Sequence, residues 1–183
     1  AGKNAEIRER AAHQAVELAH GVNPDLVKAL TFTAADRGTP AYEVIREQLT
    51  YRGTGRPIRG ILTMVMREGK ILLGPATYPE NDPLASSPGT VYQEPPAEVQ
   101  DVFRTGQPAA AGPVTDQFGS VVTAYAPVVN PRTNEVVLVI AVQLGGDWQA
   151  QVDAVRGGPL VAALSTFLLL LAGAAAVRRR NRQ

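Results

Sequence analysis

Residues 121–144 read VVTAYAPVVNPRTNEVVLVIAVQL, and this stretch decides the fold. Two β-strands are expected here, over 121–129 and 135–144, joined by a turn at 130–134 that holds Asn and Pro. The second segment is apolar at nearly every position, which is typical of a central strand buried on both faces. The sequence therefore predicts a sheet with residues 135–144 near its centre.

The chain before this stretch shows helical spacing first and strand-like runs later. Helices are expected over 3–20, 24–35, 40–52 and 96–104. Strands are expected over 58–66 and 71–73, with a turn at Glu68-Gly69 between them. The proline-rich residues 74–96 are expected to form a long loop, and a loop of that length is often functional. Helices followed by a largely antiparallel sheet indicate an α+β fold.

A charge-free segment occupies residues 157–177, and RRRNR follows it at once. At about 1.5 Å per residue, a helix of this length matches the roughly 30 Å hydrocarbon core of a bilayer. The arginine cluster at 178–183 indicates the cytoplasmic side, which places the residues before about 157 outside the cytoplasm of a bacterial cell membrane. The alternative is a long buried helix of a soluble protein. A short helix over 148–156 is expected to lead into the span.

Net charge and composition limit the partners. The formal charge is +1, but leaving out the four arginines after the span leaves 14 basic against 17 acidic residues. Such a mildly acidic domain argues against nucleic acid as a partner, because phosphate binding needs a basic surface. The absence of cysteine excludes disulfides and thiolate metal sites. We also expect an upstream targeting element and a cytoplasmic output module that lie outside these residues, as in a fragment of a longer receptor.

Several short motifs are moderately specific: Thr39-Pro40-Ala41-Tyr42, Pro88-Gly89 with Tyr92, Gly112-Pro113, Thr115-Asp116, Gly119, Ala126-Pro127-Val128 and Asp147-Trp148. With the paired strands, they resemble bacterial extracytoplasmic sensor domains of the PAS-like, Cache type. Such domains precede a membrane helix in signal-transduction receptors, namely histidine kinases of two-component systems, diguanylate cyclases and chemoreceptors. The resemblance implies N-terminal helices, a PAS-like mostly antiparallel sheet and one C-terminal transmembrane helix. Many relatives carry an acidic residue near the place of Gln143.

The expected organisation has four parts. Residues 1–22 form an N-terminal helix and possible dimer stem, 23–156 a periplasmic sensor domain, 157–177 the membrane helix and 178–183 a basic stub. A narrow apolar stripe on the first helix suits pairing with one neighbour or with its copy, so a homodimer is expected.

Six residues are candidates for a ligand site between the sheet and the 74–96 loop: Arg59, Met64, Tyr78, Tyr92, Asp116 and Tyr125. An arginine can bind a carboxylate with two hydrogen bonds, and ligand sites are mostly apolar with few polar groups. The alternatives are a strand-edge arginine, a turn aspartate and ordinary core residues. No catalytic, metal or cofactor motif is present. His13 and His20 lie about 10.5 Å apart along a helix, too far to share one metal ion.

Three functions follow, in order of preference. The first is a sensor of an unidentified small ligand, whose shift passes through the membrane helix to an output module. The second is a membrane-anchored envelope interaction protein with no small-molecule ligand. The third is an anchored enzyme, which we place last because the chain lacks a recognisable nucleophile–base pair or metal cluster.

Overall fold

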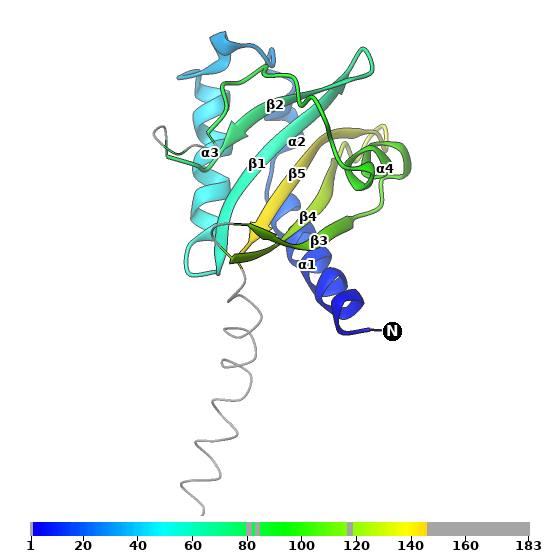
Figure 1. Ribbon diagram of the computed structural model, residues 1–183. Coiled ribbons are helices and arrows are strands. Elements are labelled where there is room, and N and C mark those ends of the chain that lie inside the picture. Colours follow the sequence, from blue (N-terminus) through cyan, green and yellow to red (C-terminus); the bar gives the residue numbers. More distant parts are fainter. Residues whose placement is uncertain (1, 80–81, 83–84, 117–118, 146–183) are drawn as a thin grey trace, which may run out of the picture. The chain divides into compact units, whose positions relative to one another are not determined.

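A five-stranded antiparallel sheet forms the centre of the domain, with strand order β2-β1-β5-β4-β3 (Figure 1). The computed structural model describes residues 2–79, 82, 85–116 and 119–145. The strands are β1 (Ile58–Arg67), β2 (Lys70–Ala76), β3 (Ala109–Asp116), β4 (Gly119–Val129) and β5 (Val136–Leu144). The helices are α1 (Lys3–Ala19), α2 (Pro24–Val27), the 3-10 turn η1 (Ala34–Asp36), α3 (Pro40–Gly53) and α4 (Ala97–Thr105).

The last strand is the central one, as the apolar run predicts. β5 pairs with β1 on one side, from Ile58↔Leu144 to Met64↔Val139, and with β4 on the other. Residues 138–142 of β5 are at most 2% exposed, so both faces of the strand are buried. The predicted α+β class is therefore confirmed.

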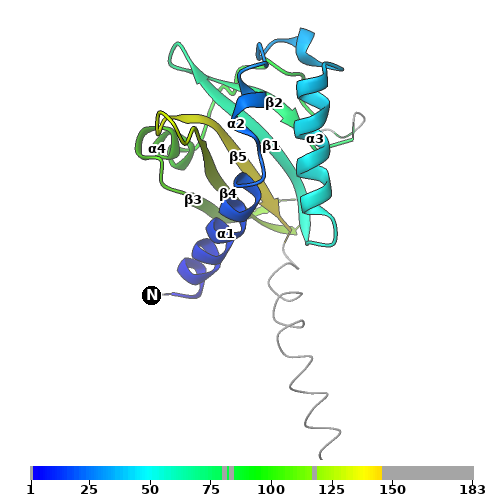
Figure 2. The same cartoon turned by 180° about the vertical axis from the view of Figure 1, so that it is seen from behind.

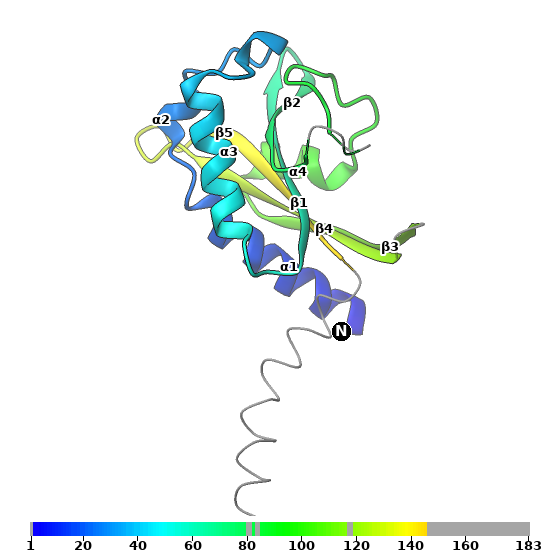
Figure 3. The same ribbon diagram turned by 90° about the vertical axis from the view of Figure 1, so that its left-hand side faces the viewer.

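Two faces of the sheet carry different coverings (Figures 2 and 3). On the helix face, α1 packs against β3 and β4, while α3 packs against β1 and β2. On the opposite face, α4 covers a cluster centred on Met64, Tyr125 and Val139. Because side chains alternate along a strand, Gly60, Leu62 and Met64 all belong to this second face. We call it the strap face, after the connection between β2 and α4 that borders it.

Most of the expected elements are found, and two expectations are wrong. The helix expected over 24–35 ends at Val27, and the long loop begins later than expected because β2 runs to Ala76. The strand β3 was not expected, since AAAGPVTD holds the alanine, glycine and proline that strands usually avoid. It forms only as an edge strand on β4.

Asp36 explains why the helix ends early. Its buried carboxylate accepts hydrogen bonds from the backbone N–H of Thr31 at 2.9 Å, from the Thr31 hydroxyl at 2.6 Å and from the backbone N–H of Phe32 at 2.7 Å. An aspartate that binds nearby backbone N–H groups in this way competes with helix formation. Phe32 takes a left-handed conformation, with φ of 53°, which no α-helix allows.

Phe32 connects this turn to the sheet. Its ring is buried under the Arg67 guanidinium, which lies 5.0 Å from the ring centroid and donates to the carbonyl of Thr31 at 2.7 Å. On the other side the ring lies against Gly74 of β2, where an added Cβ would come within 2.8 Å of it. Any larger residue at Gly74 would therefore displace Phe32.

The described residues contain no helix that is long and apolar enough to cross a membrane. The helix expected over 148–156, the span expected over 157–177 and the basic stub at 178–183 lie outside the described residues.

We predict that Asp36→Asn lowers the free energy of unfolding by about 1–3 kcal/mol at pH 7, because an amide cannot accept all three hydrogen bonds. Burial by itself raises the pKa of Asp36, but hydrogen bonds from Thr31, Phe32 and Thr33 outweigh it, and the pKa lies below its usual value of 3.8. The carboxylate therefore stabilises the fold above that value, and this contribution is lost as the pH falls through the lowered pKa.

Urea unfolding between pH 7 and pH 2.5 would measure both effects, with the difference between the two proteins narrowing at low pH. Asp101→Asn is the control, because Asp101 forms only an exposed ion pair with Arg104 and should change stability by less than about 1 kcal/mol. Equal losses in the two variants would contradict the role assigned to Asp36.

Candidate ligand-binding site

The strap is the connection between β2 and α4, comprising the described residues 77–79, 82 and 85–96. Its second half runs along the edge of β2 and pairs with it. The backbone N–H of Leu73 donates to Thr90 at 2.9 Å, Gly89 donates to Leu73 at 2.7 Å, and Tyr92 donates to Ile71 at 2.8 Å. Gly89 has φ of 84° and lies against the backbone of Phe32 and Thr33, where a Cβ would not fit. The strap is thus fixed at its end and shares contacts with the Asp36 turn.

The first half of the strap places Tyr78 on the strap face. Thr77 continues the pairing with β1, since its backbone N–H donates to the Ile61 carbonyl at 2.9 Å and its hydroxyl accepts from the Ile61 N–H at 2.9 Å. The next side chain, Tyr78, then lies directly over Gly60, where an added Cβ would overlap its ring. Glycine at this position therefore makes room for the tyrosine.

Two buried polar atoms near this place have no hydrogen-bond partner among the described residues. One is the hydroxyl of Tyr78, a residue that is only 5% exposed. The other is Oε1 of Gln143, which belongs to the residue of β5 that pairs with Gly60. A buried polar atom that lacks a partner costs about 1–3 kcal/mol, so such atoms need an explanation.

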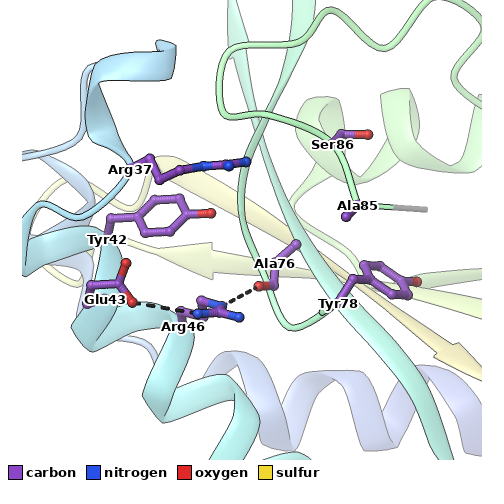
Figure 4. A pocket seen from close by; sticks show the side chains of 8 residues that line it. All are labelled: Arg37, Tyr42, Glu43, Arg46, Ala76, Tyr78, Ala85 and Ser86. Atoms are coloured by element: carbon purple, nitrogen blue, oxygen red, sulfur yellow. Dashed lines mark hydrogen bonds and ion pairs between the residues drawn. The ribbon is translucent and has the colours of Figure 1, made fainter. Parts of the chain in front are cut away.

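A small cavity of about 30 Å³ adjoins Tyr78 at the edge of β2 (Figure 4). One wall is formed by Arg37 before α3 and by Tyr42, Glu43 and Arg46 of α3, and the facing wall by Ala76, Tyr78, Ala85 and Ser86. Nε of Arg46 donates to the Ala76 carbonyl at 3.2 Å, and its guanidinium lies 3.8 Å from Glu43. Since a water molecule needs about 10–15 Å³, the cavity has room for water or a small polar group.

The tyrosines of the strap face are neutral at physiological pH. Burial raises the pKa of Tyr78 to about 12, against a smaller lowering by the Arg59 charge. Burial also raises the pKa of Tyr125 and of Tyr92. Each hydroxyl therefore keeps its proton and can both donate and accept a hydrogen bond. For Tyr125, the neighbouring Thr123 side chain lowers the pKa, but burial outweighs it.

Among the six candidate residues, only Tyr78 lines this cavity, and four others lie elsewhere on or beside the strap face. Met64 and Tyr125 are buried in the cluster under α4, and Tyr92 of the strap packs against them. Arg59 is half-buried in a bulge of β1 just before Gly60, and its charge reaches Tyr78.

Asp116 is not part of this group. It pairs with Gly119 at the far end of the β3–β4 hairpin, seven residues and therefore about 23 Å along β3 from Ala109, the partner of Tyr125.

Sequence reasoning missed several residues of the site. Gly60, Arg37, Tyr42 and Arg46 gave no usable signal, because only the pairing of strands and the packing of α3 bring them to the strap. Gln143 was singled out for its position at the end of the last strand, and the structure places it opposite Gly60.

Two larger grooves, of about 480 and 600 Å³, lie around the turn between β4 and β5. None of the six candidate residues lines them. The smaller cavity remains the better candidate site, because Tyr78 is one of its lining residues. The Tyr78 ring extends away from the side chains of α3, so its hydroxyl lies at the end of the ring farthest from the arginine wall (Figure 4).

No protein-family model and no curated protein sequence matches the chain. Among solved structures, it is similar to the GAF domain of A. aeolicus Nlh2 in an inactive state, with 12% identity, a TM-score of 0.43, and 86% of this chain and 96% of that chain covered. It is similar to the sensory domain of the Campylobacter jejuni chemoreceptor Tlp3, with 13% identity, a TM-score of 0.40, and 75% and 60% covered.

The periplasmic sensory domain of the C. jejuni chemoreceptor Tlp1 is also similar, with 18% identity, a TM-score of 0.37, and 77% of this chain and 59% of that chain covered. This chain thus spans about three fifths of the length of the two chemoreceptor domains. At TM-scores below 0.5, no functional conclusion rests on these likenesses.

Proposed function

We propose that residues 2–145 form a ligand-sensing domain whose site lies between the strap and the β1–β5 pair. The observation that carries the proposal is a pair of buried polar atoms, on Tyr78 and on Gln143, the partner of Gly60, that have no hydrogen-bond partner in the part of the chain that the structure describes. A ligand that bonds these atoms removes their unfavourable burial, so binding gains free energy that the empty domain lacks.

The residues around the site favour a small polar ligand. Oε1 of Gln143 accepts a hydrogen bond, the Tyr78 hydroxyl donates or accepts one, and the Arg37 and Arg46 guanidinium groups line the adjoining cavity. An anionic group suits the arginine wall, because guanidinium binds carboxylates well. One of the similar chemoreceptor domains, that of Tlp3, was solved in complex with L-valine, so amino acids are among the ligands to test.

The sheet offers a route for the signal. A ligand that shifts Tyr78 acts on Gly60 and on its partner Gln143, one residue before the end of β5 at Leu144. We propose that this change reaches the membrane helix expected at 157–177 and an output module beyond it, with the sensor outside the cytoplasm. The ligand moves the equilibrium only by its difference in affinity for the two states. In this proposal the chain binds and does not catalyse.

A second candidate function is that of an envelope interaction protein. The observation that favours it is the apolar groove of about 480 Å³ between the end of α1 and the end of β4, lined by prolines and valines. A partner protein seated there would need no small ligand.

A thermal-shift experiment tests the first function. The purified full chain in detergent is heated with small carboxylates, amino acids, amines and nucleobases. We expect a concentration-dependent rise of the melting temperature with one polar class, since ligand that binds only the folded state stabilises it. A folded sample that no compound shifts would favour the partner-binding function.

We predict opposite effects for two buried tyrosines of the strap face. Tyr78→Phe removes a hydroxyl without a partner and should leave the ligand-free stability unchanged or raised by up to about 1 kcal/mol. Tyr125→Phe keeps the ring in the apolar cluster under α4 but loses a buried hydroxyl beside the Thr123 side chain, and it should lower stability by up to about 1.5 kcal/mol. Only Tyr78→Phe should also reduce the thermal shift by the ligand. A loss of stability in Tyr78→Phe as large as in Tyr125→Phe would show that its hydroxyl is already bonded.

Gly60→Ala is predicted to displace Tyr78, because the added methyl overlaps its ring. We expect the variant to lose about 1–3 kcal/mol of stability and to bind the ligand more weakly. Gly53→Ala is the matched control, since its Cβ meets only Ile61 at 3.5 Å and Ile58 at 3.9 Å in ordinary contact. Equal ligand affinity in the two variants would argue that Tyr78 takes no part in binding.

A further inference from the structure

One end of the sheet gathers the most exposed apolar side chains. Among the described residues, Tyr51 is 83% exposed and Val114 is 63% exposed, whereas the other large exposed apolar residues, Val44 and Met66, are near 38% and 37%. Tyr51 lies in the last turn of α3, which leads into β1 at Ile58.

Strand pairing shows that Tyr51 and Val114 lie at the same end of the sheet. Ile58 and Val122 both pair with Leu144, at the end of β5, and Val114 pairs with Val121 in the next row. The place where β5 ends is therefore also the place where Tyr51 and Val114 are exposed.

Two arginines add positive charge beside Tyr51. Arg52 lies in the last turn of α3, and Arg56 lies in the connection to β1; both are exposed. Arg56 forms an ion pair with Glu17 at 3.2 Å, where the Glu17 side chain is 66% exposed. A surface pair of this kind contributes little free energy, so the guanidinium remains able to bind phosphate groups. Glu47, one turn before Tyr51, is the nearest other carboxylate on α3.

We propose that this end of the domain, the Tyr51–Val114 end with Arg52 and Arg56, rests on the anionic lipid surface of the membrane. The inference rests on the proposed function, because it requires the span expected at 157–177. Only eleven residues lie between Gly145 and Gly157, so even a fully extended connection reaches about 40 Å. An exposed tyrosine suits the bilayer interface, and arginines are attracted to anionic headgroups.

This contact adds a further role to the sensor. In a domain that rests on lipid, the end of β5 keeps a constant distance and orientation relative to the membrane surface. A shift of Gln143 and Leu144 would then move the connection to the membrane helix and not the whole domain. Signalling would then depend on the anionic lipid content of the membrane as well as on the ligand.

The chain has no cysteine, so single labelling sites are easy to create. We would prepare the full-length variants Tyr51→Cys, Val114→Cys, Lys70→Cys and Leu169→Cys, label each with an environment-sensitive fluorophore, and reconstitute them in vesicles. Lys70, the exposed first residue of β2, pairs with Arg67 and is the matched control at the other end of β1. The vesicles contain phosphatidylcholine with or without phosphatidylglycerol, and a nitroxide quencher sits either at the headgroup or in the acyl chain.

We expect the headgroup quencher to act on labels at 51 and 114 at least about twice as strongly as on the label at 70, and more strongly with phosphatidylglycerol. Quenching at 51 should weaken at high salt, because screening shortens electrostatic attraction. Substituting Arg52→Gln in the Tyr51→Cys background should reduce it, whereas Lys70→Gln should not.

Three outcomes would overturn the proposal. Equal quenching at 51 and 70 with deep quenching at 169 would mean that the span exists but this end does not face lipid. No quenching at 169 would overturn the membrane anchor itself and this inference with it. Protection of the label at 51 that depends on protein concentration and not on lipid would assign the surface to a second copy or another protein.

Discussion

β1 and β5 pair along most of their length, although 75 to 86 residues separate the paired positions in the chain. This pairing joins the two halves of the domain, because β2, the strap and α3 attach to β1, while β4 and β3 attach to β5. Closing so long a loop costs conformational entropy, which the burial of residues 138–142 on both faces offsets. The same pairing sets Gly60 opposite Gln143, so the candidate site exists only when the centre of the sheet is complete.

The site and the core share one face but differ in how their polar atoms are satisfied. Around Tyr125 the packing is apolar, which favours stability. Two residues further along β5 from Ala141, the partner of Tyr125, lies Gln143. Buried polar atoms of Gln143 and of Tyr78 have no partners among the described residues. Gln14 of α1 and Gln48 of α3 also carry such an atom, so the cavity beside Tyr78, together with the missing partners, is what favours a binding function there.

Residues that are distant in the sequence contact the strap near both of its ends and hold it in place. Arg46 of α3 bonds Ala76 just before the strap begins, and Gly89 near its end lies against Phe32. Phe32 in turn depends on the Asp36 carboxylate and on Arg67. A change in the strap would therefore alter contacts with three elements. These are α3 through Arg46, the turn after α2 through Phe32, and β1 through Arg67.

The sequence by itself determined the α+β class, the central place of the last strand, α1, α3 and α4, and the turn at Glu68-Gly69, because these follow from apolar periodicity and local capping or turn chemistry. It also pointed to Met64, Tyr78, Tyr92 and Tyr125. Only the tertiary structure decided that the second helix stops at Val27, because the Asp36 side chain returns to Thr31 and Phe32. The formation of β3 and the meeting of Tyr78, Gly60 and Gln143 also depend on pairing between distant segments, and no local pattern encodes such pairing.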